Sequence, residues 1–326
     1  MIPPAVQRKF ESACSDAGGL WDIKLRRLIA LFEWFTWEGL ADPHFVQELA
    51  AEDTYRERLS EMLVAYKLMR SGYELKSDSA GPDFWAYKGE QGFWVEVVTP
   101  RPTRIDPDYL AQTGATDEGM LEFPADQVLR RWTQAIDKKV AALLGPREGS
   151  PDGKRPGYLH KGIVKATQPY VIAVNGRNLR GKAGIGFNGS SGNPCAVEAL
   201  FAVGPLHIRF DPIGNGFMRP SLGRSQRASI ESPNGSPIPL TTFLDETYAQ
   251  VSAVWALDID EDEVLLDPAW PNLERNYFAS AGVFNPLAVN PLAVGAFPTF
   301  EDWTCNISGD SYQLTHHNRI PFRPSR

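Results

Sequence analysis

The pattern of apolar positions along the chain predicts three amphipathic helices. Apolar side chains recur every three to four residues in segments 22–40, 54–71 and 125–144, which places them on one face of a helix. Gly145, followed by a proline, ends the last of these segments. Each helix therefore has one face suited to packing against a sheet or against another helix.

Residues 54–71 carry the clearest of the three patterns. Thr54 and Glu57 at its start have the spacing of a capping box, in which the two side chains satisfy backbone amides of the first helical turn. Gly72 follows the segment and ends it. We therefore expect a helix with a defined start and end, directly before the strands that follow.

Short apolar runs predict strands on both sides of the third helix. Segments 73–77, 83–87 and 93–99 are strand-like, and the turn-forming residues 88–92 between the last two predict a hairpin. Segment 170–174 is wholly apolar, which is typical of a strand buried on both faces of a sheet. We expect these four strands to share one sheet, with the second and third helices packed on it.

The second half of the chain gives weaker signals. Residues 175–195 and 211–240 are rich in Gly, Asn, Ser, Pro and Arg, and we expect them to form loops. We further expect a helix at 196–203 and strands at 207–210 and 251–257. The tail that follows is rich in Pro and Asn, and its pattern predicts no element.

The order of these elements indicates an α/β fold in which helices cover a mixed sheet. At 326 residues, the chain is long enough for one large domain or two ordinary ones. We expect an N-terminal helical segment at 1–53, a core at 54–176, and a loop-rich C-terminal extension at 177–326 that packs on the core.

Composition excludes several classes of protein. A hydrophobic fraction of 43% and a charged fraction of 22% are those of a globular chain and rule out wholesale disorder. Cys14, Cys195 and Cys305 lie in no CxxC or Cys/His ligand pattern, so a zinc or disulfide framework is not expected. Because no long apolar stretch and no signal-peptide pattern occur, we expect a cytoplasmic protein that does not bind membranes.

Charge is unevenly distributed along the chain. Residues 126–227 carry 16 basic and 6 acidic side chains, whereas the whole chain has a net charge of −7. A basic segment in an acidic protein favours an anionic partner such as nucleic acid. The alternative is that this segment packs against the acidic remainder of the chain, and charge alone does not decide between the two.

Two motif-like stretches are rejected on their residues. Residues 176–183 nearly match a phosphate-binding P-loop, but Ala183 lacks the hydroxyl that would bind Mg²⁺, so an ATPase is not expected. Residues 258–262 have the acidic spacing of a calcium loop. Glu263 and Ala269 stand where such a loop needs its glycine and its last glutamate, so calcium binding is not expected either.

The most informative residues are two carboxylates in the predicted hairpin. Asp83 follows Gly-Pro at the start of one strand, and Glu96 lies inside the apolar run of the next. An unpaired buried carboxylate is costly, so Glu96 requires a partner. A Mg²⁺ ion shared with Asp83 would meet this need, since Mg²⁺ is usually held by one or two protein carboxylates. The alternative is that Glu96 pairs with a buried Arg or Lys.

Glu61 is a third candidate, on the helix directly before the strands. It lies on the side of that helix that carries Ala65 and Leu68. We expect Glu61 to assist the metal ion or its water, and the alternative is that it is a surface residue.

These residues together resemble the PD-(D/E)XK nuclease superfamily, which has the restriction-endonuclease-like fold. The Pro-Asp of that family and its Glu in the next strand match Pro82-Asp83 and Glu96, with Glu61 on the preceding helix. The later helix and the buried strand match its αβββαβ core. The resemblance covers roughly residues 54–176.

The resemblance implies a metal-dependent nuclease that hydrolyses phosphodiester bonds. Asp83 and Glu96 would bind Mg²⁺ or Mn²⁺, with Glu61 assisting. The basic segment would hold the nucleic-acid backbone, with DNA favoured over RNA, and a homodimer is left open. Within this segment, the expected contacts to nucleic acid are made by Arg130, Arg131, Gln134 and Lys165.

One position departs from the family pattern. The lysine that usually stands two residues after the Glu is Val98 here, which cannot stabilise charge on a phosphate. The following helix supplies this lysine in some members, and in this chain it carries Lys138 and Lys139. The two point about 100° apart, so only one can face the site. Lys139 shares the apolar face of the helix and is favoured, with Lys138 as the fallback. The alternative is a catalytically inactive nuclease-like module that binds nucleic acid or a protein partner.

Overall fold

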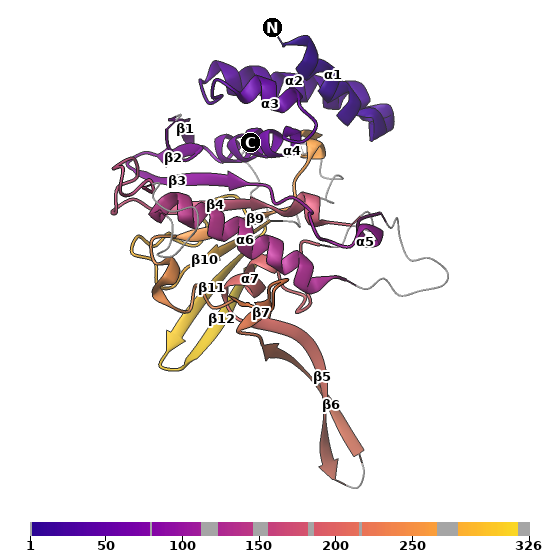
Figure 1. Cartoon of the computed structure of the whole chain (residues 1–326), viewed down its shortest axis with the longest axis vertical. Coiled ribbons are helices and arrows are strands. Elements are labelled where there is room, and N and C mark those ends of the chain that lie inside the picture. Colours follow the sequence, from indigo (N-terminus) through magenta and orange to yellow (C-terminus); the bar gives the residue numbers. More distant parts are fainter. Residues whose placement is uncertain are drawn as a thin grey trace.

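Helices and a central sheet form successive layers in the protein (Figure 1). The structure is a computed structural model that describes residues 2–78, 80–111, 123–145, 156–181, 186–214, 217–265 and 280–318. None of the helices in these ranges is long and apolar enough to cross a membrane. The N-terminal layer consists of α1 (Pro4–Ala13), η1 (Ser15–Leu20), α2 (Trp21–Trp37), α3 (Phe45–Ala50) and α4 (Tyr55–Arg70).

An eight-stranded mixed sheet forms the centre of the protein, in the order β1-β2-β3-β4-β9-β10-β11-β12. The first three strands are antiparallel neighbours, β3, β4 and β9 run parallel, β9 and β10 antiparallel, β10 and β11 parallel, and β11 and β12 antiparallel. The strands are β1 (Glu74–Lys76), β2 (Phe84–Lys88), β3 (Gln91–Val98), β4 (Tyr170–Asn175), β9 (Ala253–Leu257), β10 (Ser280–Phe284), β11 (Glu301–Ser308) and β12 (Ser311–Asn318).

The arrangement expected for the first half of the chain is confirmed. Its four predicted strands correspond to β1 to β4 and share the sheet, and α4 and α6 (Ala125–Leu144) pack on it. Helix α6 has the predicted bounds, and Gly145 after it adopts a positive φ of 94°, which suits glycine. The chain therefore has an α/β fold with a large mixed sheet flanked by helices.

Different helices cover the two faces of the sheet. Val95 and Val97 of β3 pack with α4 and the other N-terminal helices, whereas Ile172 and Val174 of β4 pack with α6. Successive side chains of a strand point to opposite faces. Glu96, between Val95 and Val97, therefore points to the face that α6 covers. All of β4 is buried, as its apolar run predicts.

Helix α4 begins directly after Thr54, but the capping box predicted there is wrong. The Thr54 hydroxyl donates to the Glu48 carbonyl at 2.7 Å and makes no capping hydrogen bond. Glu57 instead accepts from Arg101 at 2.9 Å. The last turn of α3 competes for the hydroxyl, and local spacing does not reveal such a neighbour.

The second half of the chain contains more strand than its composition predicts. The predicted helix 196–203 and the predicted strand 251–257 are present with shifted ends, as α7 (Cys195–Leu200) and β9. The predicted strand 207–210 is part of the longer β5. The loop predicted over 211–240 is wrong, because β6 to β8 lie there, and the tail without a pattern supplies β10 to β12. The extension expected to be rich in loops therefore completes half of the central sheet.

Short elements and two small sheets make up the rest of the described structure. The small sheets pair β5 with β6 and β7 with β8. These strands are β5 (Val203–Gly214), β6 (Phe217–Gln226), β7 (Ser229–Glu231) and β8 (Pro237–Pro239), and the remaining helices are α5 (Pro107–Ala111), η2 (Gly176–Leu179), η3 (Glu246–Tyr248) and η4 (Glu261–Leu265).

An acidic loop that begins at residue 258 and runs into the first turn of η4, to residue 263, connects the N-terminal helices to the sheet. Its side chains pair with basic residues of α2, of α4 and of the segment after β4: Asp262 with Lys24, Glu261 with Arg56, Glu263 with Lys67, and Asp258 with Arg180. These carboxylates already have cationic partners, so the loop acts as a structural junction. Part of the acidic charge outside residues 126–227 is therefore neutralised within the chain.

Asn175 attaches the end of β4 to this loop. Its Nδ2 donates to Ser60 Oγ at 2.8 Å and to the Ile259 carbonyl at 2.9 Å, and its Oδ1 accepts from the Ile259 amide at 3.1 Å. We expect Asn175→Ala to lower the free energy of unfolding by about 2–4 kcal/mol, because it leaves buried partners unpaired. Chemical denaturation measures this, with the exposed Asn234→Ala as control. Equal stability of the two variants would contradict a stabilising role for the hydrogen bonds of Asn175.

Candidate functional site

Asp83 and Glu96 lie opposite each other in the β2–β3 hairpin. The last paired residues of the hairpin are Phe84 and Val95, so the next step places Asp83 across from Glu96. Opposite residues of an antiparallel pair share a face, with Cβ atoms about 5 Å apart. Asp83 Oδ2 also accepts a 2.6 Å hydrogen bond from the Val97 amide, which holds this carboxylate against β3.

Lys139 reaches the two carboxylates from α6. Its Nζ lies 2.6 Å from Glu96 Oε1, and only 18% of the lysine side chain and 6% of the glutamate side chain are exposed. Burial lowers the pKa of Lys139, but the charges of Glu96 and Asp83 outweigh burial, so its pKa is raised. Lys138, the fallback, is exposed. Of the two lysines, the structure brings Lys139 to the site.

The pKa values of both carboxyl groups are raised by burial. Burial raises the pKa of Glu96 to about 7; Lys139 opposes this effect, and the charge of Asp83 adds to it. Burial likewise raises the pKa of Asp83, against the opposing effects of Lys139 and of the Val97 amide. Enclosure therefore makes a second negative charge unfavourable here unless a further cation is present.

One oxygen of Glu96 has no hydrogen-bond partner in the described parts of the chain. Lys139 engages Oε1, whereas Oε2 is buried and unpaired. Leaving a buried acceptor unpaired is costly. A carboxylate oxygen beside a second carboxylate is the kind of hard donor that Mg²⁺ and Mn²⁺ prefer. The residues present therefore fit a divalent cation held by Asp83 and Glu96.

Glu61 lies near this site but is held by an arginine. Its Oε2 accepts from Arg58 Nη1 at 2.8 Å, and Arg58 also lies 2.9 Å from Asp42. Burial, followed by the charge of Asp83, raises the pKa of Glu61 well above its ordinary value. Within the described residues, no group of three or more His, Cys, Asp or Glu side chains is spaced to hold a metal ion. The structure thus brings Glu61 into the field of Asp83 without adding it to a set of three ligands.

Tyr170 borders the same site and was missed by the sequence analysis. In the parallel β3–β4 register it pairs with Trp94, and Ile172 pairs with Glu96, so Tyr170 shares the face of Glu96. Its hydroxyl is buried, with no hydrogen-bond partner among the residues described. Burial, followed by the charge of Glu96, raises the pKa of Tyr170 well above its ordinary value. The alternation of β4 is the signal that could have found it.

Tyr158 is the second residue that the sequence analysis missed. Burial, followed by the charge of Glu96, raises the pKa of its hydroxyl to about 12. The Tyr158 amide donates to the Ala142 carbonyl at 2.9 Å, so the end of α6 positions it. Because Tyr158 lies in a loop, no periodic pattern marks it in the sequence.

The expected contacts to nucleic acid divide into two kinds. Gln134 and Lys165 have exposed side chains that a ligand can reach. Arg131 donates to Thr103 Oγ1 at 2.9 Å, and Arg130 donates to a carbonyl of β7 at 2.6 Å. The two arginines therefore attach neighbouring segments to α6 in the structure.

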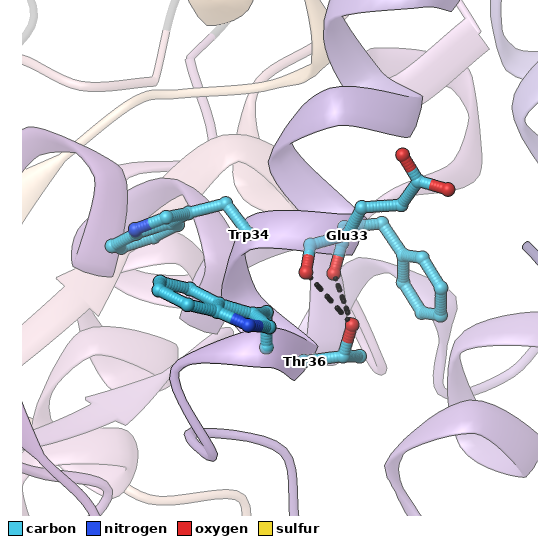
Figure 2. A pocket seen from close by; sticks show the side chains of 5 residues that line it. Glu33, Trp34 and Thr36 are labelled. Carbon is cyan, nitrogen blue, oxygen red and sulfur yellow. Dashed lines mark hydrogen bonds between the residues drawn. The ribbon is translucent and has the colours of Figure 1, made fainter. Parts of the chain in front are cut away.

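A hollow on α2 shares no residue with this site (Figure 2). It is lined by Phe32, Glu33, Trp34, Thr36 and Trp37. The Thr36 hydroxyl donates to the helix carbonyls of Phe32 at 2.9 Å and of Glu33 at 3.0 Å, so it is used within the helix.

The P-loop-like stretch of the sequence is only partly described by the structure. It begins in η2, directly after β4, whereas Lys182 and Ala183 lie outside the described residues.

Comparisons of the chain with protein-family models, with curated proteins and with solved structures find no match. The functional assignment therefore depends on the residues of this chain and on their geometry.

Proposed function

We propose that this protein is a metal-dependent nuclease of the PD-(D/E)XK type, with a restriction-endonuclease-like fold, that hydrolyses phosphodiester bonds in nucleic acid. The observation that carries the proposal is the 2.6 Å contact of Lys139 with Glu96, beside Asp83. The lysine supplies from α6 the cation that Val98 does not provide. A purely structural ion pair would not need Asp83, a second, half-buried carboxylate on the same face.

Asp83 and Glu96 are the residues that would hold Mg²⁺ or Mn²⁺. When bound, the metal ion lowers the pKa of a water and offsets charge on the scissile phosphate. Two carboxylates and one ammonium carry a net charge of −1, so with a divalent ion the group becomes net positive. A positively charged enclosed site favours a phosphate, whereas the same site without the ion repels it.

Lys139 is positioned to stabilise negative charge that develops on the phosphoryl oxygens. The raised pKa of its ammonium keeps it protonated at neutral pH. Its contact with Glu96 fixes its direction, and its burial limits competition from water. A donor held in place in this way contributes most where charge develops in the transition state. Glu61, held by Arg58, acts on the site through its charge next to Asp83.

The exposed polar side chains near α6 support a polyanionic substrate. Gln134 is exposed on α6, and Lys165 is exposed in the loop before β4. Cationic side chains hold nucleic acid through its phosphates without reading its sequence. The proposed substrate is therefore nucleic acid, with DNA as the first choice.

Cleavage assays test this function directly. Purified protein is expected to cleave plasmid or single-stranded DNA with Mg²⁺ or Mn²⁺ and to be inactive in EDTA. Asp83→Asn and Glu96→Gln are expected to lower the rate at least about 100-fold, because each removes one proposed ligand. Glu90→Gln, at an exposed position in the turn of the same hairpin, is the matched control.

The same assays distinguish the alternative function. Val98 at the usual lysine position is the observation that favours a catalytically inactive module. Wild-type protein that binds DNA or RNA but cleaves neither with any divalent ion would contradict hydrolysis and support the binding module.

A further inference from the structure

A two-stranded arm projects from the layers of the protein. Strands β5 and β6 pair with each other, from Leu206 with Arg224 to Pro212 with Met218. Figure 1 shows this arm extending well beyond the helices and the central sheet. An isolated two-stranded hairpin is only marginally stable in water. An arm of this length is therefore expected to pack against another surface.

The two faces of the arm differ in chemistry. Directly opposite residues of an antiparallel pair share a face. One face carries Arg224 at its base, opposite Leu206, where its Nε donates to the Ser191 carbonyl at 3.0 Å. The other side chains of this face are uncharged and mostly apolar: Leu206, Ile208, Phe210, Pro212, Met218, Pro220 and Leu222. The other face carries polar side chains: His207, Arg209, Asp211, Arg219 and Ser221. Beyond Arg224, the arm is therefore amphipathic, with its apolar and charged groups on opposite faces.

The apolar face of the arm is open. Between 47% and 72% of each of its five large apolar residues is exposed, and these five are Leu206, Ile208, Phe210, Met218 and Leu222. Large apolar residues gathered on one exposed element are characteristic of an interaction surface. The partner must offer an apolar surface of similar length, since the hydrophobic effect scales with the apolar area removed from water.

We propose that the apolar face of the arm binds the same face of the arm of a second copy of this chain. In a two-fold dimer the same patch meets itself, and two-fold dimers are the commonest soluble oligomers. The apolar face carries no charge from Ile208 to Leu222, so its copy meets no repulsion there. Arg209 and Arg219 point away from this contact. The dimer does not depend on the hydrolysis proposed above.

The area of the apolar face fits such a dimer. A large apolar side chain has roughly 150–200 Å² of surface, so five half-exposed ones on each copy remove about 1,000 Å² from water. The prolines and the backbone between these side chains add to this area. The sum reaches the lower part of the roughly 1,200–2,000 Å² that stable interfaces bury.

Prolines direct the contact to the face of the arm and not to its edges. Pro205, Pro212 and Pro220 lack the amide hydrogen with which a strand pairs. Both strands of the arm therefore offer poor edges for an added strand. Nucleic acid would meet the opposite face, where Arg209 and Arg219 lie, and would leave the apolar face uncovered.

Analytical ultracentrifugation without nucleic acid tests the dimer. Wild-type protein is expected to sediment at about twice its 36.2 kDa. Ile208→Asp combined with Leu222→Asp is expected to weaken the dimer at least about 100-fold, because the contact would bury unpaired charges. Arg209→Ser combined with Arg219→Ser alters the other face of the same strands and is expected to remain dimeric.

A variant without the arm provides a second test. Residues 206–224 are replaced by an Asn-Gly turn, which connects antiparallel strands. This variant is expected to be monomeric. It is also expected to keep the circular dichroism spectrum of a folded protein and to cleave DNA. The proposal is overturned by wild-type protein that is monomeric at about 100 µM, well above the dissociation constants of specific complexes. A dimer that persists in the aspartate variant or without the arm overturns it as well.

Discussion

Lys139→Met is expected to lower the rate of DNA hydrolysis by about 100- to 1,000-fold, with Mn²⁺ binding retained. The size of this effect is that of removing one fixed donor aimed at developing charge. Mn²⁺ binding is expected to persist because Asp83 and Glu96, the two proposed ligands, are unchanged. Single-turnover cleavage measures the rate, and calorimetry measures metal binding.

Lys138→Met is the matched control for this prediction. It removes the same charge from the position of α6 directly before Lys139, where the side chain is exposed. We expect it to change the cleavage rate less than about three-fold, since an exposed charge acts only through screened attraction to the substrate. Equal losses in the two variants would contradict a specific role for Lys139.

A lysine placed at position 98 of β3, where the nuclease family usually has it, tests whether Lys139 serves catalysis or only pairs with Glu96. Val98 lies two residues after Glu96, so their side chains share a face of the sheet. Val98→Lys combined with Lys139→Met is expected to recover at least about 10-fold of the rate lost in Lys139→Met. A folded double variant without any recovery would show that the position of Lys139 itself, and not the presence of a cation, is required.

The folding cost of these variants is measured alongside the rates. Lys139→Met leaves Glu96 as a buried carboxyl group without its cation, and breaking such a pair costs about 3–5 kcal/mol. Part of this cost is avoided when Glu96 takes up a proton, which its raised pKa favours. Chemical denaturation of each variant therefore distinguishes an inactive folded protein from an unfolded one.

The fold could be predicted wherever burial leaves a regular pattern in the sequence. Helix α6 buries one face against the sheet, and Gly145 stops it, so its bounds follow from spacing alone. Strand β4 is buried on both faces and reads as an unbroken apolar run. In both elements, tertiary packing and local sequence preference favour the same structure.

The pattern fails where strands are exposed or short. Strand β6 is rich in Gly, Pro, Ser and Arg, and none of its side chains from Met218 to Gln226 is buried, so its composition is that of a loop. Strand β10 has five residues, all buried, which is too short to distinguish from an apolar turn. Whether these segments form strands depends on the neighbouring strands they pair with, and local sequence does not reveal those neighbours.

The candidate site could be predicted in part. Glu96 stands out because a charged residue interrupts an apolar strand, and Lys139 because it lies on the apolar face of a helix. Both signals come from a charged residue at a position that the pattern buries. The contact of Glu61 with Arg58, and the position of Tyr158, depend on how loops and helix ends meet. Local sequence does not encode these contacts between loops and helix ends.

The metal-free protein is expected to lose stability as the pH rises from about 4.5 to about 7. Burial raises the pKa of Glu96 in the folded protein from its ordinary 4.5 to about 7. Between these values the folded state binds more protons than the unfolded state, so the free energy of unfolding falls with rising pH and levels off above about 7. The raised pKa of Asp83 acts in the same direction. The contribution of Glu96 is on the order of 3 kcal/mol.

A divalent ion is expected to reverse this loss, and to do so only where the carboxyl groups ionise. Mn²⁺ at about 100 times its dissociation constant would add about 2.7 kcal/mol at pH 8, because it binds only the folded protein. At pH 5 a proton on Glu96, whose pKa is raised to about 7, competes with the ion, so little stabilisation is expected. Thermal unfolding with and without Mn²⁺ between pH 5 and 8 measures both effects. Glu90→Gln should retain them and Glu96→Gln should lose them. If Glu96→Gln were stabilised by Mn²⁺ as strongly as the wild type at pH 8, the ion would bind elsewhere, and the proposed site would be wrong.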